Sequence, residues 1–316
     1  MIEIKENIPL APHTIYKIGG SARYFAQARN AAEVEEALVF AAEKRAAVFI
    51  LGAGSNILIS DAGFDGLVIR MIGGEITIEG ERMTADAGVM MARLAGAAAR
   101  AGLTGFEWGI GVPGTIGGSV RGNAGCFGGE MRDVIESVGI IDTGKSHSLW
   151  KSDFHNTACG FGYRDSLFKQ HPEWIILSAT LHLRAGDSAA IQKKIKHITA
   201  ERLDRQDIGT KSCGCIFKNP PWPADAEERQ KLLSAFPFLA QFAQRTHLPA
   251  SFLIDRAGLK GACVGATVVS ARHANFFVNE GGATAADVRA LAALTKEKVH
   301  ARFGVVLEEE IQYVGF

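Results

Sequence analysis

No apolar run in this chain of 316 residues approaches the length of a membrane span. Charge of one sign is not in surplus either, because 34 Lys and Arg balance 34 Asp and Glu. This balance argues against a nucleic-acid or membrane-surface binder, so any anionic ligand must be met by a few local cations. The opening M-I-E-I-K-E-N-I-P-L lacks the apolar core of a signal peptide. We therefore expect a cytoplasmic protein; a monomer is the expectation, although no feature decides the oligomeric state.

Cysteine is also scarce. The five cysteines are odd in number and do not have the spacing of a metal site. Without an export signal, reduced thiols are the default. We predict no metal site, and a monovalent cation near ligand phosphates stays open. The cysteines are Cys126, Cys159, Cys213, Cys215 and Cys263.

Glycine, in contrast, is abundant. Eight of the twenty residues from 109 to 128 are Gly. Glycine costs backbone entropy and adds no packing, so such density indicates main-chain amides lying close to a phosphate or a flat cofactor. A second turn of this kind, L-G-A-G-S-N at 51–56, has an ordinary tight turn as its alternative.

The first part of the chain alternates strand and helix signals. Asn30 is a helix cap with Glu33 three residues on, and an apolar face follows. The apolar run at 48–51 then leads into the first glycine turn, which indicates a βαβ-like opening. Residues 76–86 predict a hairpin at Gly80, and 89–101 a helix of small residues. The predicted buried face of the first helix is Val34, Ala37, Leu38 and Ala41.

After residue 186 the pattern becomes helical. Ile191, Ile195 and Ile198 head a charged amphipathic helix, and a helical stretch is expected around 226–246. Thr284 caps a last helix, and the pattern V-V-L-E-E-E-I-Q-Y-V predicts a strand at the end of the sequence. The inward residues of the last helix are Val288, Leu291, Ala292, Thr295 and Val299.

The spelling G-x-G-x-x-G at Gly109, Gly111 and Gly114 invites a dinucleotide-fold interpretation. Three features weigh against it. The preceding T-G-F-E-W is not a buried strand, Pro113 lies inside the motif, and no amphipathic helix follows at once. An extended backbone wrapped along a cofactor fits better.

Five ordered motifs resemble one family over about the whole chain. They are L-G-A-G-S-N, G-V-P-G-T-I-G-G with N-A-G-C-F-G, Y-R-D-S, G-C-I-F-K-N-P, and the terminal L-E-E-E-I. Together they resemble the UDP-N-acetylenolpyruvoylglucosamine reductases, also called UDP-N-acetylmuramate dehydrogenases. The short 183–205 segment is similar to the shorter form of the family.

The resemblance implies an α+β fold: a two-subdomain FAD-binding region of the vanillyl-alcohol-oxidase (PCMH) type and a C-terminal α+β substrate-binding domain. We expect the FAD-binding subdomains at 1–70 and 71–190, the substrate-binding domain at 191–304, and a C-terminal strand at 305–316 with the catalytic glutamate. It further implies that NADPH reduces a bound FAD, which gives hydride to the enolpyruvyl group of a UDP-sugar in peptidoglycan precursor synthesis.

Three residues match the family's catalytic positions. Arg164 suits the carboxylate on which negative charge develops, and its alternative is a structural ion pair with Asp165 or another acid. Cys215 stands where the family usually has a serine proton donor; its alternative is simple packing as a small hydrophobe. Glu310 matches the second glutamate of the terminal motif, and burial should raise its pKa. The register among Glu308, Glu309 and Glu310 stays open.

The resemblance also carries over binding positions for substrate and for FAD, and the substrate positions have a solvated or core polar residue as their alternative. Cys213 is interpreted as structural. For substrate we predict Tyr163, Lys218, Asn219, His273 and Asn275. For FAD we predict Leu51, Gly52, Ala53, Gly54, Ser55, Asn56, Gly111, Val112, Pro113, Gly114, Thr115, Gly117, Gly118 and Asn123.

Two rival functions remain. One is another flavin oxidase or dehydrogenase of the same superfamily, against which Arg164, Cys215 and Glu310 argue. The other is a catalytically silent flavin-binding module, which the cysteine replacement keeps open. Flavin bleaching by NADPH followed by reoxidation with the enolpyruvyl nucleotide separates them from the main hypothesis.

Overall fold

The computed structural model describes residues 1–144, 150–205 and 209–316. Its contacts divide the chain into two units, described separately below. The first comprises residues 1–9, 21–55 and 64–204, and the second comprises 10–20, 56–63 and 205–316. Two N-terminal segments thus group with the C-terminal third, a division that differs from the expected boundaries at 70 and 190. The reason is long-range pairing: β4 (Ile57–Ile59) forms a parallel pair with β18 (Gln312–Val314).

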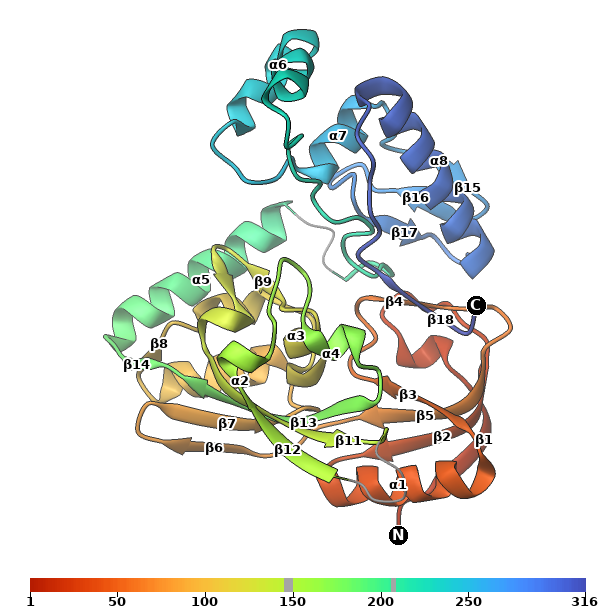
Figure 1. Ribbon diagram of the computed structural model, residues 1–316, viewed down its shortest axis with the longest axis vertical. Coiled ribbons are helices and arrows are strands. Elements are labelled where there is room, and N and C mark those ends of the chain that lie inside the picture. The colour runs from red at the N-terminus through yellow and green to blue at the C-terminus, as the bar shows by residue number, and fades with distance from the viewer. Residues whose placement is uncertain (145–149, 206–208) are drawn as a thin grey trace. The chain divides into compact units, whose positions relative to one another are not determined.

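The first sheet of the first unit has the strand order β1-β2-β5-β3, in which β2, β5 and β3 are parallel. Helix α1 (Ala31–Lys44) connects β2 to β3 and covers one face of this sheet (Figure 1). The Asn30 side chain accepts a hydrogen bond from the amide of Glu33, and the predicted inward face is buried. The βαβ-like opening is confirmed. The strands are β1 (Ile4–Pro9), β2 (Ser21–Ala28), β3 (Ala47–Leu51) and β5 (Phe64–Met71).

The second sheet of this unit is antiparallel, with the order β12-β11-β13-β7-β6. Its β6–β7 hairpin turns at Gly80, where φ is +62°, as predicted. Helices α2 (Met91–Arg100) and α5 (Ser188–Arg205) belong to the same unit, together with the short β8 (Leu103–Thr104) and β14 (Arg184–Ala185). The sheet consists of β6 (Ile76–Glu79), β7 (Arg82–Asp86), β11 (Ile135–Asp142), β12 (Trp150–His155) and β13 (Trp174–His182).

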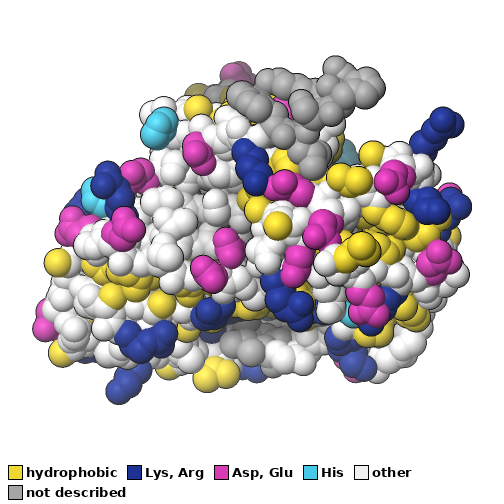
Figure 2. Space-filling view, turned by 90° about the horizontal axis from the view of Figure 1, so that it is seen from below, with side chains coloured by type: hydrophobic (Ala, Val, Ile, Leu, Met, Phe, Trp, Pro, Cys, Tyr) yellow, Lys and Arg dark blue, Asp and Glu magenta, His cyan; other side chains and the backbone are white. Residues whose placement is uncertain are grey.

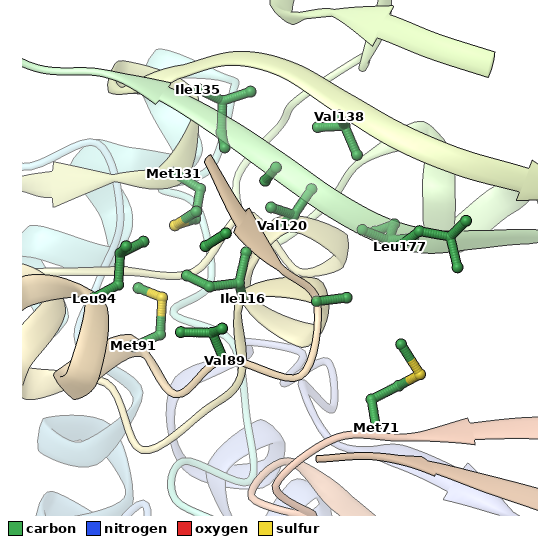
Figure 3. Close-up of a cluster of buried hydrophobic side chains, with 14 of the residues drawn as sticks. Met71, Val89, Met91, Leu94, Ile116, Val120, Met131, Ile135, Val138 and Leu177 are labelled. Atoms are coloured by element: carbon green, nitrogen blue, oxygen red, sulfur yellow. The ribbon is translucent and has the colours of Figure 1, made fainter. Parts of the chain in front are cut away.

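The glycine-rich segment is not extended, and this part of the prediction was wrong. It folds into a 3-10 helix, a short α-helix and a two-stranded hairpin. Ile116 and Val120 in α3 are fully buried and point toward Leu94 of α2 and Ile135 of β11 (Figure 3). These two apolar residues are four positions apart, so they lie on the same face of this short helix. The elements are η2 (Glu107–Gly111), α3 (Ile116–Arg121), β9 (Gly125–Cys126) and β10 (Gly129–Glu130).

The second unit packs helices against a three-stranded sheet, β15-β16-β17. Helix α8 (Ala285–Phe303) begins at Thr284, whose hydroxyl accepts from the amide of Asp287 at 3.1 Å, and its predicted inward residues are buried. The helical stretch expected at 226–246 is split, because Pro237 cannot continue a helix. Its parts are α6 (Ala226–Ala235) and η5 (Pro237–Phe242); the sheet is β15 (Cys263–Val264), β16 (Thr267–Val269) and β17 (Phe277–Asn279).

The remaining short elements are η1 (Ala11–His13), η3 (Met131–Asp133), η4 (Asn156–Ala158), α4 (Leu167–Gln170) and α7 (Ala250–Arg256). Helices and strands are mixed in both units, which confirms the α+β class. Acidic and basic side chains are interspersed over the face drawn in Figure 2, as the balanced composition suggests. Within the three described ranges, no helix is long and apolar enough to cross a membrane.

Candidate active site

Two glycine-bearing turns of the first unit lie against each other. One is Gly52–Ser55, directly after β3, and the other is the 111–118 segment. A Cβ on Gly52 would lie 2.5 Å from Oγ1 of Thr115, so a side chain at this position would displace that threonine. Gly54 has φ of +65°, a conformation that favours glycine. The two predicted cofactor turns are therefore brought together, with bare backbone where they meet.

The N-terminus of α3 is already occupied by the chain itself. The amides of Ile116 and Gly117 donate to the carbonyls of Val89 and Ala87 at 2.8 and 2.9 Å. The Thr115 side chain caps the next amide of the helix. A phosphate at these turns would thus be held by the 51–56 backbone rather than by the first amides of α3.

Arg202, which the sequence analysis did not single out, lies over the glycine-rich segment. A Cβ on Gly111 would be 3.2 Å from both Cδ of Arg202 and Sγ of Cys126. Burial raises the pKa of the Cys126 thiol, while the nearby guanidinium groups of Arg202 and Arg164 oppose that rise. Two arginines therefore flank the same thiol beside this loop. The only sequence signal was a basic residue near the end of a helix expected to be charged.

Arg164 is presented by a tight turn of the first unit. Gly162 and Asp165 exchange backbone hydrogen bonds of 2.9 and 3.3 Å, with Tyr163 and Arg164 between them. Arg164 has φ of +54°, which is unfavourable for a residue with a long side chain. Its guanidinium donates to the carbonyl of Gly125 at 2.8 Å and lies 5.6 Å from the centre of the Tyr163 ring. The turn thus directs a cation toward the glycine-rich segment.

Asn123, predicted to contact FAD, is fully buried and is bonded to protein atoms. Its Nδ2 donates to the carbonyl of Gly162 at 2.7 Å and to Glu130 at 2.9 Å, so both amide hydrogens are engaged. Its Oδ1 accepts from the amide of Arg132 at 3.0 Å. A direct cofactor contact through this amide stays a prediction; the observed contacts join the glycine-rich segment to the Arg164 turn.

Cys215 begins an extended segment in the second unit. This segment pairs on one side with Phe276 and on the other side with Glu309, through the isolated bridges of Cys215 and Phe217. The amide of Glu310 donates to the carbonyl of Ile216 at 2.8 Å. Cys215 and Glu310 are therefore on neighbouring extended segments of one unit, although they are 95 positions apart in the sequence.

The three consecutive glutamates have different surroundings. Glu308 forms an ion pair of 2.6 Å with Lys218 and is 73% exposed, and Glu309 forms one of 3.2 Å with Lys296. The backbone carbonyl of Glu310 accepts from Nδ2 of Asn56 at 3.3 Å. Of the three, Glu310 has its charge close to the buried Cys213 in the Cys215 segment. The three glutamates thus differ in their contacts, and the register with Glu310 as the functional glutamate stays a prediction.

Several predicted substrate residues bond to the protein itself. Asn275 is 2% exposed and clamps Phe217, accepting from its amide at 2.9 Å and donating to its carbonyl at 2.8 Å. Asn219 accepts from the amide of Ala250 at the start of α7. The His273 ring lies 4.5 Å from that of Phe276. Lys218 forms the ion pair with Glu308, and its side chain is 21% exposed. The substrate roles of these residues stay predictions.

This pair of glycine turns on an α+β framework is typical of a flavin-binding oxidoreductase. Residues 22–148 match the family described as FAD binding domain, which confirms FAD as the predicted cofactor. The backbone between the two glycine turns fits such a group. Side chains at Gly52 and Gly111 would fill the space there, and Arg202 supplies a cation beside it. This defines the class of the protein.

The chain belongs to the UDP-N-acetylenolpyruvoylglucosamine reductase family. Residues 206–314 match the C-terminal domain of that reductase. The reductase of Synechococcus sp. (strain JA-3-3Ab) is 39% identical over 99% of this chain and 91% of its own, and that of Solibacter usitatus is 34% identical over 99% and 97%. The crystal structure of UDP-N-acetylenolpyruvylglucosamine reductase from Thermus caldophilus matches with a TM-score of 0.74 and 30% identity, over 99% of both chains.

Proposed function

We propose that this protein reduces the enolpyruvyl group of UDP-N-acetylglucosamine enolpyruvate to UDP-N-acetylmuramate, with NADPH as the electron source. Full-length similarity to reductases of this name supports the reaction. The chemistry supplied by a bound FAD would be hydride transfer, from NADPH to the flavin and from its N5 to the enolpyruvyl methylene carbon. A cytoplasmic location and a monomeric state are part of this proposal and rest on the sequence alone.

The neighbouring carbon must then take a proton, and we assign its donation to the Cys215 thiol. The observation that carries this assignment is the pairing of the Cys215 segment with the Glu309–Glu310 segment, which brings a thiol and a carboxylate together in one unit. A thiol with an ordinary pKa of about 8.5 gives up its proton more easily than a serine hydroxyl does. Glu310, if protonated or orienting a donor, stabilises the enolate that precedes proton transfer.

Arg164 provides fixed positive charge for the substrate carboxylate as negative charge develops there. Its left-handed backbone supports this role, because a residue held in a strained conformation at a candidate site suggests selection for where the side chain points. The planar guanidinium can donate two parallel hydrogen bonds to a carboxylate. Lys218 and Asn219, directly after the proton donor, are proposed to contact the UDP-sugar.

The test uses anaerobic stopped-flow spectroscopy of the flavin in two half-reactions. Cys215→Ala should be bleached by NADPH at the wild-type rate, and its reoxidation by the enolpyruvyl nucleotide should slow by roughly 10²–10⁴-fold. Cys215→Ser should keep much of the activity, and its alkaline limit should move to higher pH. Cys263→Ala, which removes an exposed thiol, is the control. Normal turnover by Cys215→Ala would refute the assignment, and bleaching without reoxidation in the wild type would favour a rival flavoprotein.

A further inference from the structure

We infer that Asn123 is a positioning residue, which holds the Arg164 turn in place and acts on the reaction through that arginine. This inference rests on the proposed role of Arg164. It assigns the fully buried Asn123 amide to substrate reduction, and it does not require the amide to touch FAD or substrate.

The contacts between the two segments form a regular series. Residues 121, 123 and 125 alternate along the glycine-rich segment, and each bonds to the Arg164 turn. The Ser166 hydroxyl donates to the carbonyl of Arg121 at 2.7 Å, the Asn123 amide donates to the carbonyl of Gly162 at 2.7 Å, and Arg164 donates to the carbonyl of Gly125 at 2.8 Å. Asn123 supplies the side chain for the central contact. It therefore binds the residue at which the turn begins.

Asn123 is itself fixed on the other side. Its Oδ1 accepts from the amide of Arg132, and its second amide hydrogen points to the Glu130 carboxylate, which also pairs with Arg132 at 3.0 Å. The side chain is 0% exposed and the backbone φ is +41°, a left-handed conformation that asparagine tolerates better than most residues. A rigid, fully bonded amide can therefore transmit the position of the loop to the turn.

The turn requires such support because its conformation is strained. The carbonyl of Gly162 accepts both from Asn123 and, at 3.3 Å, from the amide of Asp165 that closes the turn. With Arg164 at φ of +54°, a turn released from the loop would relax toward a more favourable backbone conformation and would turn the guanidinium away. A displacement of about 1 Å at a reacting group can cost roughly 100-fold in rate.

Asn123→Gly is the discriminating variant, because glycine accommodates the left-handed backbone while the side chain that carries the amide is removed. We expect reoxidation of the reduced flavin by the enolpyruvyl nucleotide to slow by roughly 100-fold. Flavin reduction by NADPH and FAD affinity should stay within about threefold of wild type, because the amide has no part in either step. Asn123→Asp, which keeps the shape but loses both donor hydrogens, should show the same split.

A double-mutant cycle with Arg164→Lys then tests whether Asn123 acts through the arginine. In the Arg164→Lys background, Asn123→Gly should slow reoxidation by less than about threefold, since the group that it positions has been replaced. Equal slowing in both backgrounds would overturn the inference, as would a parallel loss of FAD affinity, which would return Asn123 to a cofactor contact. If neither Asn123 variant folds, Ser166→Ala releases the adjacent tether, and normal reoxidation there would also overturn it. If Arg164→Lys alone reoxidises normally, the proposed role of Arg164 fails first, and the two failures are distinguishable.

Discussion

Replacement of the buried Glu107 carboxylate should destabilise the first unit. Glu107 begins η2 and is 3% exposed. Three donors converge on it: the Thr104 hydroxyl at 2.5 Å, the Gly105 amide at 3.2 Å and Nζ of Lys194 at 2.9 Å. Lys194 is in α5, so the carboxylate joins that helix to the start of the glycine-rich segment.

Glu107→Gln keeps the size of the side chain but offers a single acceptor oxygen to these donors. At least one donor then faces the new amide group, and the ion pair with Lys194 is lost. A buried donor left without its acceptor costs about 1–3 kcal/mol, and we expect about 3 kcal/mol because the lost acceptor is a charged oxygen. For a unit of this size that loss corresponds to a Tm about 6–12 °C lower.

Thermal and urea unfolding at pH 7, followed by circular dichroism, measure this effect. Lys194→Ala is the matched control: the Lys194 side chain is 54% exposed, so its removal should cost only about 1 kcal/mol and leave Thr104 and Gly105 in place. If Lys194→Ala cost as much as Glu107→Gln, the reasoning would be refuted, since the stability would then lie in the exposed lysine rather than in the buried carboxylate.

The pH dependence gives the same prediction a second check. Burial alone would raise the pKa of Glu107, but hydrogen bonds from Thr104, Lys194 and Gly105 outweigh it and lower the pKa. The carboxylate therefore contributes stability above its unfolded pKa of about 4.3, and this contribution is lost as the pH falls through the lower folded value. The gap in stability between wild type and Glu107→Gln should close in that acidic range.

Two further predictions concern the site. Gly52→Ala puts a Cβ 2.5 Å from Oγ1 of Thr115, so it should weaken FAD binding by roughly tenfold or more in fluorescence titration. The control is Gly96→Ala, which should leave FAD affinity unchanged, because the nearest atom to its Cβ is 3.4 Å away on a flexible arginine. Asn275→Ala leaves the amide and carbonyl of Phe217 without their side-chain partner, which should cost about 2–4 kcal/mol in urea unfolding and slow flavin reoxidation more than flavin reduction. Equal effects on both half-reactions would contradict the assignment of the Cys215 segment to reoxidation.

Local signals predicted the long helices well. The caps of helices α1 and α8, Asn30 and Thr284, can be recognised in the sequence, and so can their buried faces. Both depend on residues that are close together in the chain. Helix α3 was missed because six residues are too few to show a helical period. The division into units was also beyond local patterns, since the pairing of β4 with β18 joins segments about 250 residues apart.

The candidate site follows the same division between local and distant information. Motifs identified Arg164, Cys215 and the glycine turns, because each is a short run of residues that resembles a family pattern. The contacts of Asn123 and Asn275 could not be predicted, since the partner of each amide lies 39 or 58 positions away. Both look like ligand-binding residues in the sequence, because an amide that binds backbone and an amide that binds ligand have the same chemistry.

The two thiols around Gly214 differ in burial, and this difference bears on the proposed proton donor. Gly214 has φ of +76°, so this segment is not a regular strand, and the alternation that would send Cys213 to the opposite face from Gly214 does not apply. Access separates the thiols instead. Cys213 is 1% exposed, and its burial, with Cys215 and Glu310 adding to the effect, raises the pKa of its thiol well above the ordinary value. It therefore keeps its proton and cannot reach a substrate, whereas Cys215 is half-buried and accessible. Of the two thiols, only Cys215 therefore has the access to solvent that the proposed proton donation requires.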